Sequence, residues 1–383
     1  MDKTIGLACN ISTGKLDANQ AVSGGEYPFF TCAEFPDQID HFAYDDDVVL
    51  VAGNNARGNF HVSRYKGKFN AYQRTYILTA KEGFNIDYVY YALKLELKRL
   101  REKSQGSQTK FLTMPILTGI HFRDITGDEQ TEIANVLSVI DQKIELNNRI
   151  NAELEAMAKT LYDYWFVQFD FPDANGKPYK TSGGKMVYNP TLKREIPEGW
   201  SDKTLSEIAN ITIGQSPEGS SYNDEGVGTI FYQGSTDFGW LFPTTRQYTT
   251  APSRMAKKGD ILLSVRAPVG DMNIANTDCC IGRGLAALNS KTGSDGFLFY
   301  VMKYFKQIFD RRNSEGTTFG SITKNDLHSL TLAYPTSNLL KKYDEIVTNY
   351  NKMIFERSLE NRELIALRDW LLPMLMNGQV TVK

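Results

Sequence analysis

The sequence predicts an α+β protein made by tandem duplication of one unit, a mixed α/β domain followed by a long helix. Residues of the first half recur 210 positions later, as in Ile133 and Tyr343, Leu137 and Val347, Ile144 and Ile354, Asn151 and Asn361, Leu154 and Leu364, and Leu161 and Leu371. Upstream segments share this offset, as in Gly106 and Gly316, Thr113 and Thr323, and Leu117 and Leu327. A unit that occurs twice is expected to perform one task at two places.

Composition indicates an ordinary globular chain. Its 383 residues are enough for two or three domains, and 41% hydrophobic with 23% charged residues is typical of such domains. We expect no membrane span, because no apolar run approaches ~18 residues, and no signal peptide follows Met1. The four cysteines lack a repeated CxxC spacing and predict reduced thiols in a cytoplasmic protein. Four scattered histidines give no reason to predict a metal site.

Charge is unevenly distributed, although the net charge is only −2. Residues 57–110 carry twelve Lys and Arg against four acidic residues, and residues 240–330 carry twelve against seven. Residues 128–155 carry seven acidic residues against two basic ones. A basic region in each globular half favours phosphate contact, although a solvated charged surface explains it equally well.

Each half begins with strands and continues with an amphipathic helix. Residues 47–52 predict a buried strand that ends in a turn at Gly53, and residues 84–101 predict a helix. The second half repeats this order, with a strand over 260–265 and a helix over 296–312.

A long helix is predicted over residues 129–166. Its apolar residues alternate three and four apart, which is typical of a coiled-coil seam, and Asn147 and Asn151 fall on that seam. Thirty-seven residues at ~1.5 Å each give a rod of roughly 55 Å, which needs a partner. The expected partner is its own copy over residues 338–372.

The expected layout follows from connectivity. We place the first domain at 1–126, its helix at 127–167, a linker at 168–200, the second domain at 201–335, its helix at 336–376 and a tail at 377–383. The second helix must return to pair with the first, so the two are expected to form an antiparallel coiled coil with pseudo-twofold symmetry. Such helices would act as a spacer between two domains, and in a DNA binder this predicts two half-sites at a set spacing.

Motifs for catalysis on DNA are missing from the sequence. The nearest string to an adenine methyltransferase loop is Tyr188-Asn189-Pro190-Thr191, which lacks the second proline. No GxxxxGK[ST] phosphate loop occurs. We therefore predict no catalytic residues and no cofactor for this chain.

Four segments resemble the specificity subunit of type I restriction–modification systems. They are residues 129–144 (EQTEIANVLSVIDQKI), 164–169 (YWFVQF), 196–200 (IPEGW) and 371–378 (LLPMLMNG). The resemblance spans nearly the whole chain and implies two variable target-recognition domains separated by antiparallel helices. It also implies a subunit that reads a bipartite sequence in double-stranded DNA, and the target sequence does not carry over. The Pro-Glu-Gly-Trp lead-in of the second domain has no counterpart before the first, so whether the N-terminus is complete stays open.

The resemblance further implies partners. Two methyltransferase subunits would be seated on this chain, and motor-nuclease subunits would join them in the complete enzyme. S-adenosylmethionine, ATP and Mg²⁺ would then be bound by those partner subunits, and no membrane would be involved.

Repeated polar turns are the candidate DNA-binding residues. Turns after the first strand and the buried strand give Thr13, Gly14, Lys15, Asn54, Asn55 and Arg57, with Gln215, Ser216 and Arg266 in the second half. A second repeated loop gives Ser107, Gln108, Thr109 and Lys110, with Thr317, Thr318 and Lys324. Asn pairs with adenine and Arg with guanine in the major groove, whereas Lys66 and Lys68 are expected to contact phosphates. Plain hairpin turns are the structural alternative, and structural ion pairs explain Arg74 and Arg283 as well as DNA does.

The long helices supply the candidates for the seam and for partner docking. They are Leu137, Ile144, Asn151, Leu154, Leu161, Trp165, Val347, Ile354, Asn361, Leu364, Trp370 and Leu371. The aromatic group Trp165, Phe166 and Phe169 favours packing between domain and helix, with methyltransferase docking as the alternative. Trp370 and Leu371 are expected to share any docking role.

Three functions compete at this point. The chain is a DNA-specificity subunit, a DNA enzyme with a divergent site, or a coiled-coil scaffold that bridges proteins without DNA. Missing cofactor motifs weigh against the enzyme, and basic regions in both halves weigh against the scaffold.

Overall fold

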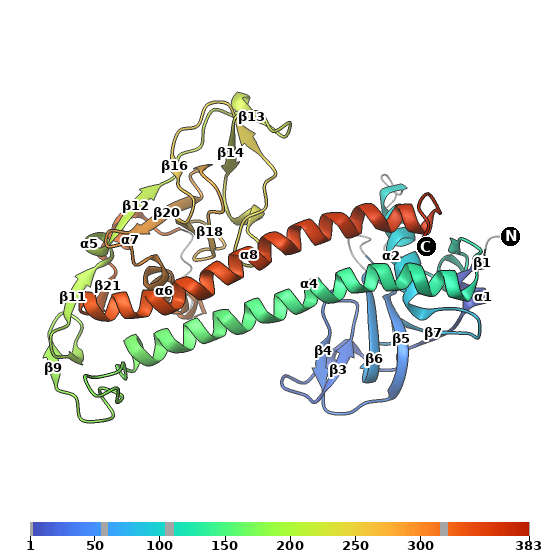
Figure 1. Cartoon of the computed structure of the whole chain (residues 1–383), viewed down its shortest axis with the longest axis horizontal. Helices are drawn as coiled ribbons and strands as arrows, with labels where there is room; N and C mark the ends of the chain where they lie inside the picture. The colour runs from blue at the N-terminus through green and yellow to red at the C-terminus, as the bar shows by residue number, and fades with distance from the viewer. Residues whose placement is uncertain (1–2, 55–59, 104–110, 315–320, 383) are drawn as a thin grey trace. The chain divides into compact units, whose positions relative to one another are not determined.

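A computed structural model describes residues 3–54, 60–103, 111–314 and 321–382 of the chain. The chain divides into two compact units, which we call unit 1 (residues 1–149 with 357–383) and unit 2 (residues 150–356). Helix α4 (Gly127–Tyr162) leads from unit 1 into unit 2, and α8 (Ser337–Met376) leads back, as the colours of Figure 1 trace. Each unit therefore contains a globular domain and part of each long helix.

Unit 1 is built on one mixed sheet covered by a helix. Its further elements are, in chain order, β1 (Lys3–Thr4), α1 (Ile5–Ala8), β2 (Cys9–Thr13), η1 (Ala18–Gln20), β3 (Tyr27–Phe30), β4 (Asp37–Ile39), β5 (Tyr44–Ala52), β6 (Val62–Ala71), β7 (Thr75–Ala80), α2 (Ile86–Lys103), α3 (Met114–Thr118) and β8 (His121–Phe122). The sheet has the strand order β2-β7-β5-β6-β3-β4, and β1 pairs separately with β8. The expected strand at 47–52 and helix at 84–101 correspond to β5 and α2.

Strand β5 carries the hydrophobic centre of this sheet. Its last five residues, 48–52, are all buried, because β6 and β7 flank it on both edges and α2 packs against it. Burial on both faces explains why this strand reads as a continuous apolar run instead of an alternating one. Charged residues Asp45 and Asp46 at its start stay exposed.

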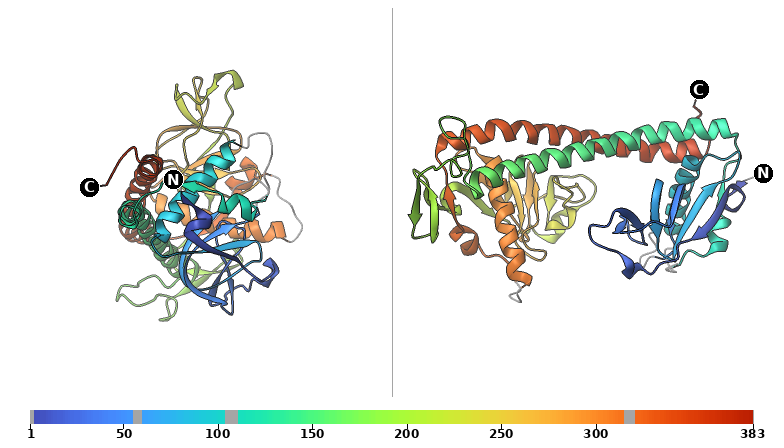
Figure 2. Two further views of the ribbon diagram at one scale, coloured as in Figure 1. Left: turned by 90° about the vertical axis from the view of Figure 1, so that its right-hand side faces the viewer. Right: turned by 90° about the horizontal axis from the view of Figure 1, so that it is seen from below.

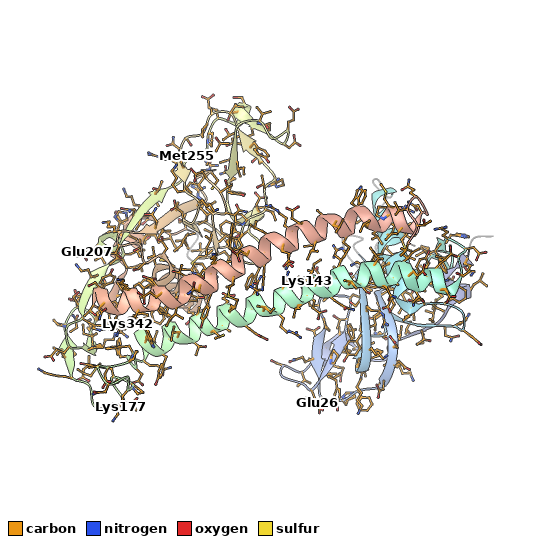
Figure 3. The ribbon with its side chains drawn as sticks, in the orientation of Figure 1. Glu26, Lys143, Lys177, Glu207, Met255 and Lys342 are labelled. Carbon is orange, nitrogen blue, oxygen red and sulfur yellow. The ribbon has the colours of Figure 1, made fainter. Side chains whose placement is uncertain are left out.

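Within unit 1 the two long helices run antiparallel. Asp141 of α4 pairs with Arg368 of α8 at 2.9 Å, whereas Lys143 (labelled in Figure 3) pairs with Glu360 at 3.4 Å. Higher residue numbers on α4 thus meet lower numbers on α8. Leu137 is fully buried in the core of this unit, to which the C-terminal turns of α8 also contribute.

Buried asparagines cross-link the same pair of helices. The Nδ2 of Asn147 donates to Asn361 Oδ1 at 2.9 Å and to Glu360 Oε2 at 2.8 Å. The Nδ2 of Asn361 in turn donates to Asn148 Oδ1 at 2.8 Å. Because the amide groups satisfy each other only in one register, this network fixes the alignment of α4 and α8 in unit 1.

Unit 2 repeats the plan of unit 1, with its strands divided between two sheets. Its further elements are η2 (Asp163–Val167), β9 (Met186–Asn189), β10 (Arg194–Pro197), β11 (Ser201–Thr204), α5 (Leu205–Ile208), β12 (Ala209–Ile213), η3 (Gly219–Ser221), β13 (Tyr222–Asn223), β14 (Thr229–Tyr232), η4 (Ser235–Asp237), β15 (Tyr248–Thr249), β16 (Met255–Ala256), β17 (Ile261–Ser264), β18 (Met272–Ile274), β19 (Cys279–Ile281), β20 (Leu285–Ser290), α6 (Asp295–Ser314), α7 (Lys324–Ser329) and β21 (Thr331–Tyr334). One sheet has the order β12-β20-β17-β18, and a second has the order β13-β15-β14-β19-β16.

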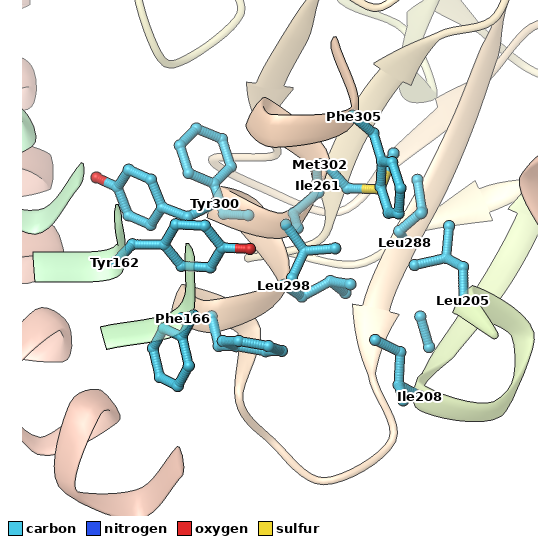
Figure 4. Close-up of a cluster of buried hydrophobic side chains, with 14 of the residues drawn as sticks. Tyr162, Phe166, Leu205, Ile208, Ile261, Leu288, Leu298, Tyr300, Met302 and Phe305 are labelled. Atoms are coloured by element: carbon cyan, nitrogen blue, oxygen red, sulfur yellow. The ribbon is translucent and has the colours of Figure 1, made fainter. Parts of the chain in front are cut away.

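The core of unit 2 joins its sheet to both long helices. Leu205, Ile261 and Leu288 meet Tyr162 and Phe166 in one cluster (Figure 4). α4 ends here in a π-helical turn, η2, which carries Trp165 and Phe166.

The aromatic group at this helix end is a packing group. Trp165 is only 7% exposed, and its ring centroid lies 6.0 Å from that of Tyr343 on α8. The Tyr343 hydroxyl donates to the carbonyl of Ala158 on α4 at 3.2 Å. Trp165, Phe166 and Phe169 are thus buried where the domain packs on the long helices.

The segment over 168–200, expected as a linker, contains a pair of strands and an aromatic stack. Strands β9 and β10 pair antiparallel, and Phe171 stacks on both Tyr179 and Trp200. Asp170 accepts from the backbone N–H and the hydroxyl of Thr181, which holds the pKa of its carboxyl below the usual range.

The two units match element by element, so the tandem duplication and the α+β class are confirmed. β1 and β8 correspond to β11 and β21, and the order β2-β7-β5 corresponds to β12-β20-β17. The helices α2 and α3 correspond to α6 and α7, and the views of Figure 2 show α4 and α8 side by side. Among the described residues, no helix is long and apolar enough to cross a membrane. All four cysteines are free, and burial raises the pKa of Cys9 to about 12.

Candidate nucleic-acid interface

In unit 1, four chain segments meet where β7 begins. Thr13 at the end of β2 pairs with Tyr76, and Ala52 at the end of β5 pairs with Thr75. The backbone N–H of Gly14 donates to the Thr75 carbonyl at 3.1 Å, and that of Gly53 donates to the Arg74 carbonyl at 2.8 Å. Two polar turns that are 39 residues apart in sequence are therefore held beside one strand.

A fourth segment returns to the same place from α2. The N–H of Leu112 donates to the Gly53 carbonyl at 3.0 Å, and Phe111 forms an isolated bridge with Asn54. We call residues 13–15, 53–54, 73–75 and 111–112 junction 1.

The turns at junction 1 need glycine for close backbone approach. A Cβ on Gly14 would overlap the carbonyl oxygens of Ala71 and Tyr72, and a Cβ on Gly53 would overlap that of Arg74. Both contacts are with backbone atoms, which move less easily than side chains.

Unit 2 contains the same arrangement with different side chains. Gly214 N–H donates to Leu285 O at 2.9 Å, and Val265 N–H donates to Gly284 O at 2.9 Å. Ile322 N–H donates to Val265 O at 2.8 Å, and Arg266 bridges to Ser321 as Asn54 bridges to Phe111. We call residues 213–216, 265–266, 283–285 and 321–322 junction 2. The backbone geometry thus gives Arg266 the position in junction 2 that Asn54 has in junction 1.

Junction 1 presents a mixed polar and basic surface. Lys15, Gln73 and Arg74 are exposed, whereas Thr13 and Asn54 are half-buried. The Gln73 amide donates to Asp17 Oδ1 at 2.6 Å, which orients that side chain.

Junction 2 presents two arginines in place of this set. Gln215, Arg266 and Arg283 are exposed. Ser216 is half-buried and exchanges hydrogen bonds with Gln233, and its Oγ accepts from the Arg283 N–H at 3.3 Å. The two junctions therefore share one backbone arrangement but carry different hydrogen-bond donors and acceptors.

Arg74 belongs to junction 1 and Arg283 to junction 2. The sequence alone left open whether these two arginines form structural ion pairs or contact DNA. In the part of the chain that the structure describes, neither forms an ion pair, so the structural alternative has no support. Their exposure beside Asn54 and Arg266 adds them to the candidate interface. The signal in sequence was their near coincidence in the repeat.

The remaining candidates are distributed as follows. Eight candidates lie outside the described residues, namely Asn55, Arg57, Ser107, Gln108, Thr109, Lys110, Thr317 and Thr318. Lys324 begins α7 directly after junction 2, behind the N-cap Thr323. Lys66 and Lys68 lie on β6, opposite Asp47 and Asp45, and are not part of junction 1. Lys66 pairs with Asp47 at 3.5 Å, and Lys68 lies 4.6 Å from the Phe42 ring centroid.

The long helices bury most of their candidate residues. The buried ones are Leu137, Ile144, Asn151, Leu154, Val347, Ile354 and Asn361. The partly buried ones are Leu161, Leu364 and Leu371. Trp370 is different, because 56% of it is exposed. It is a surface residue and not part of the seam.

Trp370 is one of several large apolar side chains that the long helices expose in unit 1. Leu367 lies one turn before it on α8, and α4 exposes Val139 and Leu146. Val139 is 63% exposed. These four residues, which we call the apolar helix surface, are large side chains that water solvates poorly.

No metal-binding cluster of His, Cys, Asp or Glu occurs among the described residues. Three carboxylates with lowered pKa values, those of Glu129, Glu207 and Asp326, accept hydrogen bonds at helix starts. Asp326 accepts from the N–H and the hydroxyl of Thr323, which lowers its pKa at the start of α7.

Comparison with known proteins places this chain in one family. A sequence model of the type I restriction modification DNA specificity domain matches residues 2–156 and 197–362, once in each half. A putative type I restriction enzyme MjaX specificity subunit of Methanocaldococcus jannaschii is 32% identical over 83% of this chain and 70% of that protein. The EcoDI specificity subunit of Escherichia coli is 33% identical, over 54% of this chain and 48% of its own length.

A solved structure supports the shared fold. The S subunit of the type I restriction–modification system from M. genitalium is 19% identical and aligns over 98% of this chain and 96% of its own, with a TM-score of 0.65. Two matches of the domain in one chain, and a close relative that is covered over most of its length, are sufficient for assignment. The chain therefore belongs to the DNA specificity subunits of type I restriction–modification systems.

Proposed function

We propose that junctions 1 and 2 each read one half of an asymmetric bipartite DNA target. The observation that carries this proposal is the combination of one backbone frame with unlike side chains. Thr13, Lys15 and Asn54 occupy junction 1, whereas Gln215 and Arg266 occupy the same positions in junction 2. Equal frames orient DNA equally, and different donors and acceptors select different bases.

Asn54 and Arg266 are the proposed base readers of the two junctions. Both follow the C-terminal end of a buried strand and are fixed by a bridge to the returning segment. Asn recognises adenine and Arg recognises guanine through two hydrogen bonds each. Arg266 has no ion-pair partner among the described residues, so its guanidinium is available to a base.

The chain itself is proposed to be non-catalytic and to seat methyltransferase subunits. The apolar helix surface offers a docking site, with Trp370 as its largest exposed side chain. Exposed aromatic residues beside aliphatic ones are typical of interface centres. Two methyltransferase subunits, and motor-nuclease subunits in the complete enzyme, are the expected partners.

The decisive experiment is methylome sequencing of cells that produce this chain with its methyltransferase subunits. Arg266→Gln is expected to relax or change one base in one half of the methylated motif, because a bidentate pair contributes about 1–3 kcal/mol of discrimination. Asn54→Ser is expected to change the other half. If either variant alters both halves, or neither alters any base, the assignment of one half-site to each junction is wrong.

A second measurement tests the non-catalytic role. The purified chain, incubated with DNA and labelled S-adenosylmethionine, is expected to transfer no methyl groups. Transfer that persists after contaminating methyltransferase is removed would contradict it.

A further inference from the structure

A basic groove lies on the α2 side of unit 1. Its volume is about 430 Å³, and it is lined by three cations of α2, namely Lys94, Lys98 and Arg101, together with Phe35 and Phe60. The spacing of four and then three residues places the cations on one face of the helix. Along the helix axis, Lys98 lies about 6 Å from Lys94 and Arg101 lies about 4.5 Å from Lys98.

The buried face of α2 explains why these cations point outward. Val89 and Ala92, on the side of the helix away from the cations, are buried in the core of unit 1, so the cations are left on the surface. The Lys94 ammonium donates to the Tyr90 hydroxyl at 3.1 Å and lies 4.9 Å from its ring centroid. In the described part of the chain neither Lys94 nor Lys98 forms an ion pair with a carboxylate.

The chemistry of the groove suits a polyanion with apolar parts. Its lining includes one carboxylate, Glu34, against the three cations. Phe35 is 75% exposed at the groove, whereas Phe60 is buried beneath it. Exposed phenyl rings beside ammonium groups match a sugar–phosphate chain, whose deoxyribose is apolar and whose phosphates are anionic.

The groove adjoins junction 1. His61 lines it, and the His61 carbonyl accepts from the N–H of Ala52 at 2.9 Å. Ala52 also pairs with Thr75 of junction 1 and stands two residues before Asn54. A strand of DNA whose bases meet junction 1 therefore has backbone within reach of the groove.

We propose that this groove binds the DNA sugar–phosphate backbone next to the half-site that junction 1 reads. Lys94 and Lys98 contact phosphates, and Phe35 packs against deoxyribose. This inference rests on the proposed function of junction 1, and it adds a contact that strengthens binding without selecting bases.

Unit 2 lacks the same pair of lysines. The starts of the two helices match at an offset of 209, since Val89 N–H donates to Asn85 O and Leu298 N–H donates to Ser294 O. Lys303 and Gln307 of α6 therefore stand at the positions of Lys94 and Lys98, and Lys303 is engaged in an ion pair with Glu155. The backbone contact is thus a property of unit 1, and it predicts that the two halves of the target contribute unequally to the salt dependence of binding.

The test measures DNA affinity of the complex with methyltransferase subunits against salt concentration, on a duplex that carries its methylated motif. The variant Lys94→Gln/Lys98→Gln removes two phosphate contacts, so the slope of log K against log[salt] is expected to become shallower by about 1.8. Between 50 and 200 mM salt, the unaltered complex then loses roughly twelve-fold more affinity than the variant. The ratio of specific to non-specific binding is expected to stay unchanged.

A matched control removes two exposed lysines elsewhere. Lys177→Gln/Lys180→Gln lies in the segment between β-strands of unit 2, where Figure 3 labels Lys177, and is expected to leave the slope unchanged. An unchanged slope in Lys94→Gln/Lys98→Gln, or an equal change in the control, would overturn the proposal. If the unaltered complex shows no preference for its motif, the proposed function fails instead, and the two failures are distinguished.

A second variant removes the apolar contact and keeps the charges. Phe35→Ala is expected to weaken binding several-fold at every salt concentration without a change of slope, because no phosphate contact is lost. Its exposed position makes a folding defect an improbable cause, and circular dichroism of the variant checks this. Binding equal to that of the unaltered complex would remove Phe35 from the site.

Discussion

Replacing one asparagine of the seam network should loosen the helix pair in unit 1, and replacing two should largely repair it. In Asn361→Leu, Asn147 loses its acceptor at 2.9 Å and keeps Glu360. Both Asn147 and Asn361 are buried, so the lost partner is not replaced by water. An unsatisfied buried polar group costs about 1–3 kcal/mol, and we expect about 2 kcal/mol.

The double variant Asn147→Leu/Asn361→Leu removes both polar groups from the seam. Two leucines can pack against each other where two amides were paired, and such paired replacements are often neutral or stabilising. With a cost of about 2 kcal/mol for each single variant and almost none for the double variant, the coupling free energy between the two positions is expected to be about 4 kcal/mol in magnitude. Loss of register specificity, and not loss of stability, is the expected consequence of the double change.

Hydrogen exchange measured by mass spectrometry suits this test, because it reports local opening of the helices. Peptides within 137–149 and 357–371 should exchange about 30-fold faster in Asn361→Leu, since each 1.4 kcal/mol corresponds to a factor of ten. Asn349→Leu is the matched control, because Asn349 is exposed on α8. Equal exchange in Asn361→Leu and the unaltered chain, or a double variant that exchanges faster than both single variants, would refute the reasoning.

Three further predictions concern the docking surface, the junctions and the helix caps. Trp370→Ala should reduce recovery of methyltransferase subunits in co-purification and leave thermal stability nearly unchanged, whereas the buried Trp165→Ala should cost about 3–5 kcal/mol of unfolding free energy. Gly14→Ala should lower the free energy of unfolding by about 1–3 kcal/mol and weaken DNA binding, because the new Cβ overlaps backbone oxygens. An unchanged melting temperature would contradict this. The backbone N–H and hydroxyl of Thr126 lower the pKa of Glu129 from 4.5, so its stabilisation is present above that pH and is lost as pH falls through the lowered value. In Glu129→Gln, stability should therefore fall less steeply as the pH is lowered below 4.5. Thermal melts at several pH values measure this.

Elements with strong periodicity were predictable from the sequence. The helices expected at 84–101 and 296–312 appear as α2 and α6, and the strands expected at 47–52 and 260–265 appear as β5 and β17. Apolar residues three and four apart, or in a short continuous run, reflect local geometry that a sequence displays directly. The same holds for the buried asparagines, whose seam positions follow from heptad spacing.

The junctions could be predicted only in part. The repeat identified the turns at Gly14 and Asn54 and matched the turn of Asn54, Asn55 and Arg57 to the turn of Arg266. It did not show that the turns at Gly14 and Asn54 meet at Thr75. That convergence depends on strand register between segments distant in sequence. The role of Arg74 and Arg283 could not be predicted for the same reason. Whether an arginine has an ion-pair partner depends on tertiary contacts between segments distant in sequence.

The order of the 168–200 segment was also missed. Its prolines and glycines predict turns, and turns are present, for example at Gly176 and Gly183 with positive φ. What holds them is the stacking of Phe171 on Tyr179 and Trp200, with ring centroids 4.6 and 5.5 Å away. Aromatic stacking of this kind leaves no periodic signal in the sequence.

The order in which the chain is made has a consequence for unit 1. Unit 2 is one continuous stretch, 150–356, whereas unit 1 needs residues 357–383 to be complete. A ribosome that adds 5–20 residues per second needs roughly 10–50 s to progress from residue 149 to the end of the chain. During that time Leu137 and its neighbours lack the C-terminal turns of α8 that cover them in the finished protein. The domain that is synthesised first is thus the last to complete its core. Its apolar residues are exposed to chaperones during this stage of synthesis.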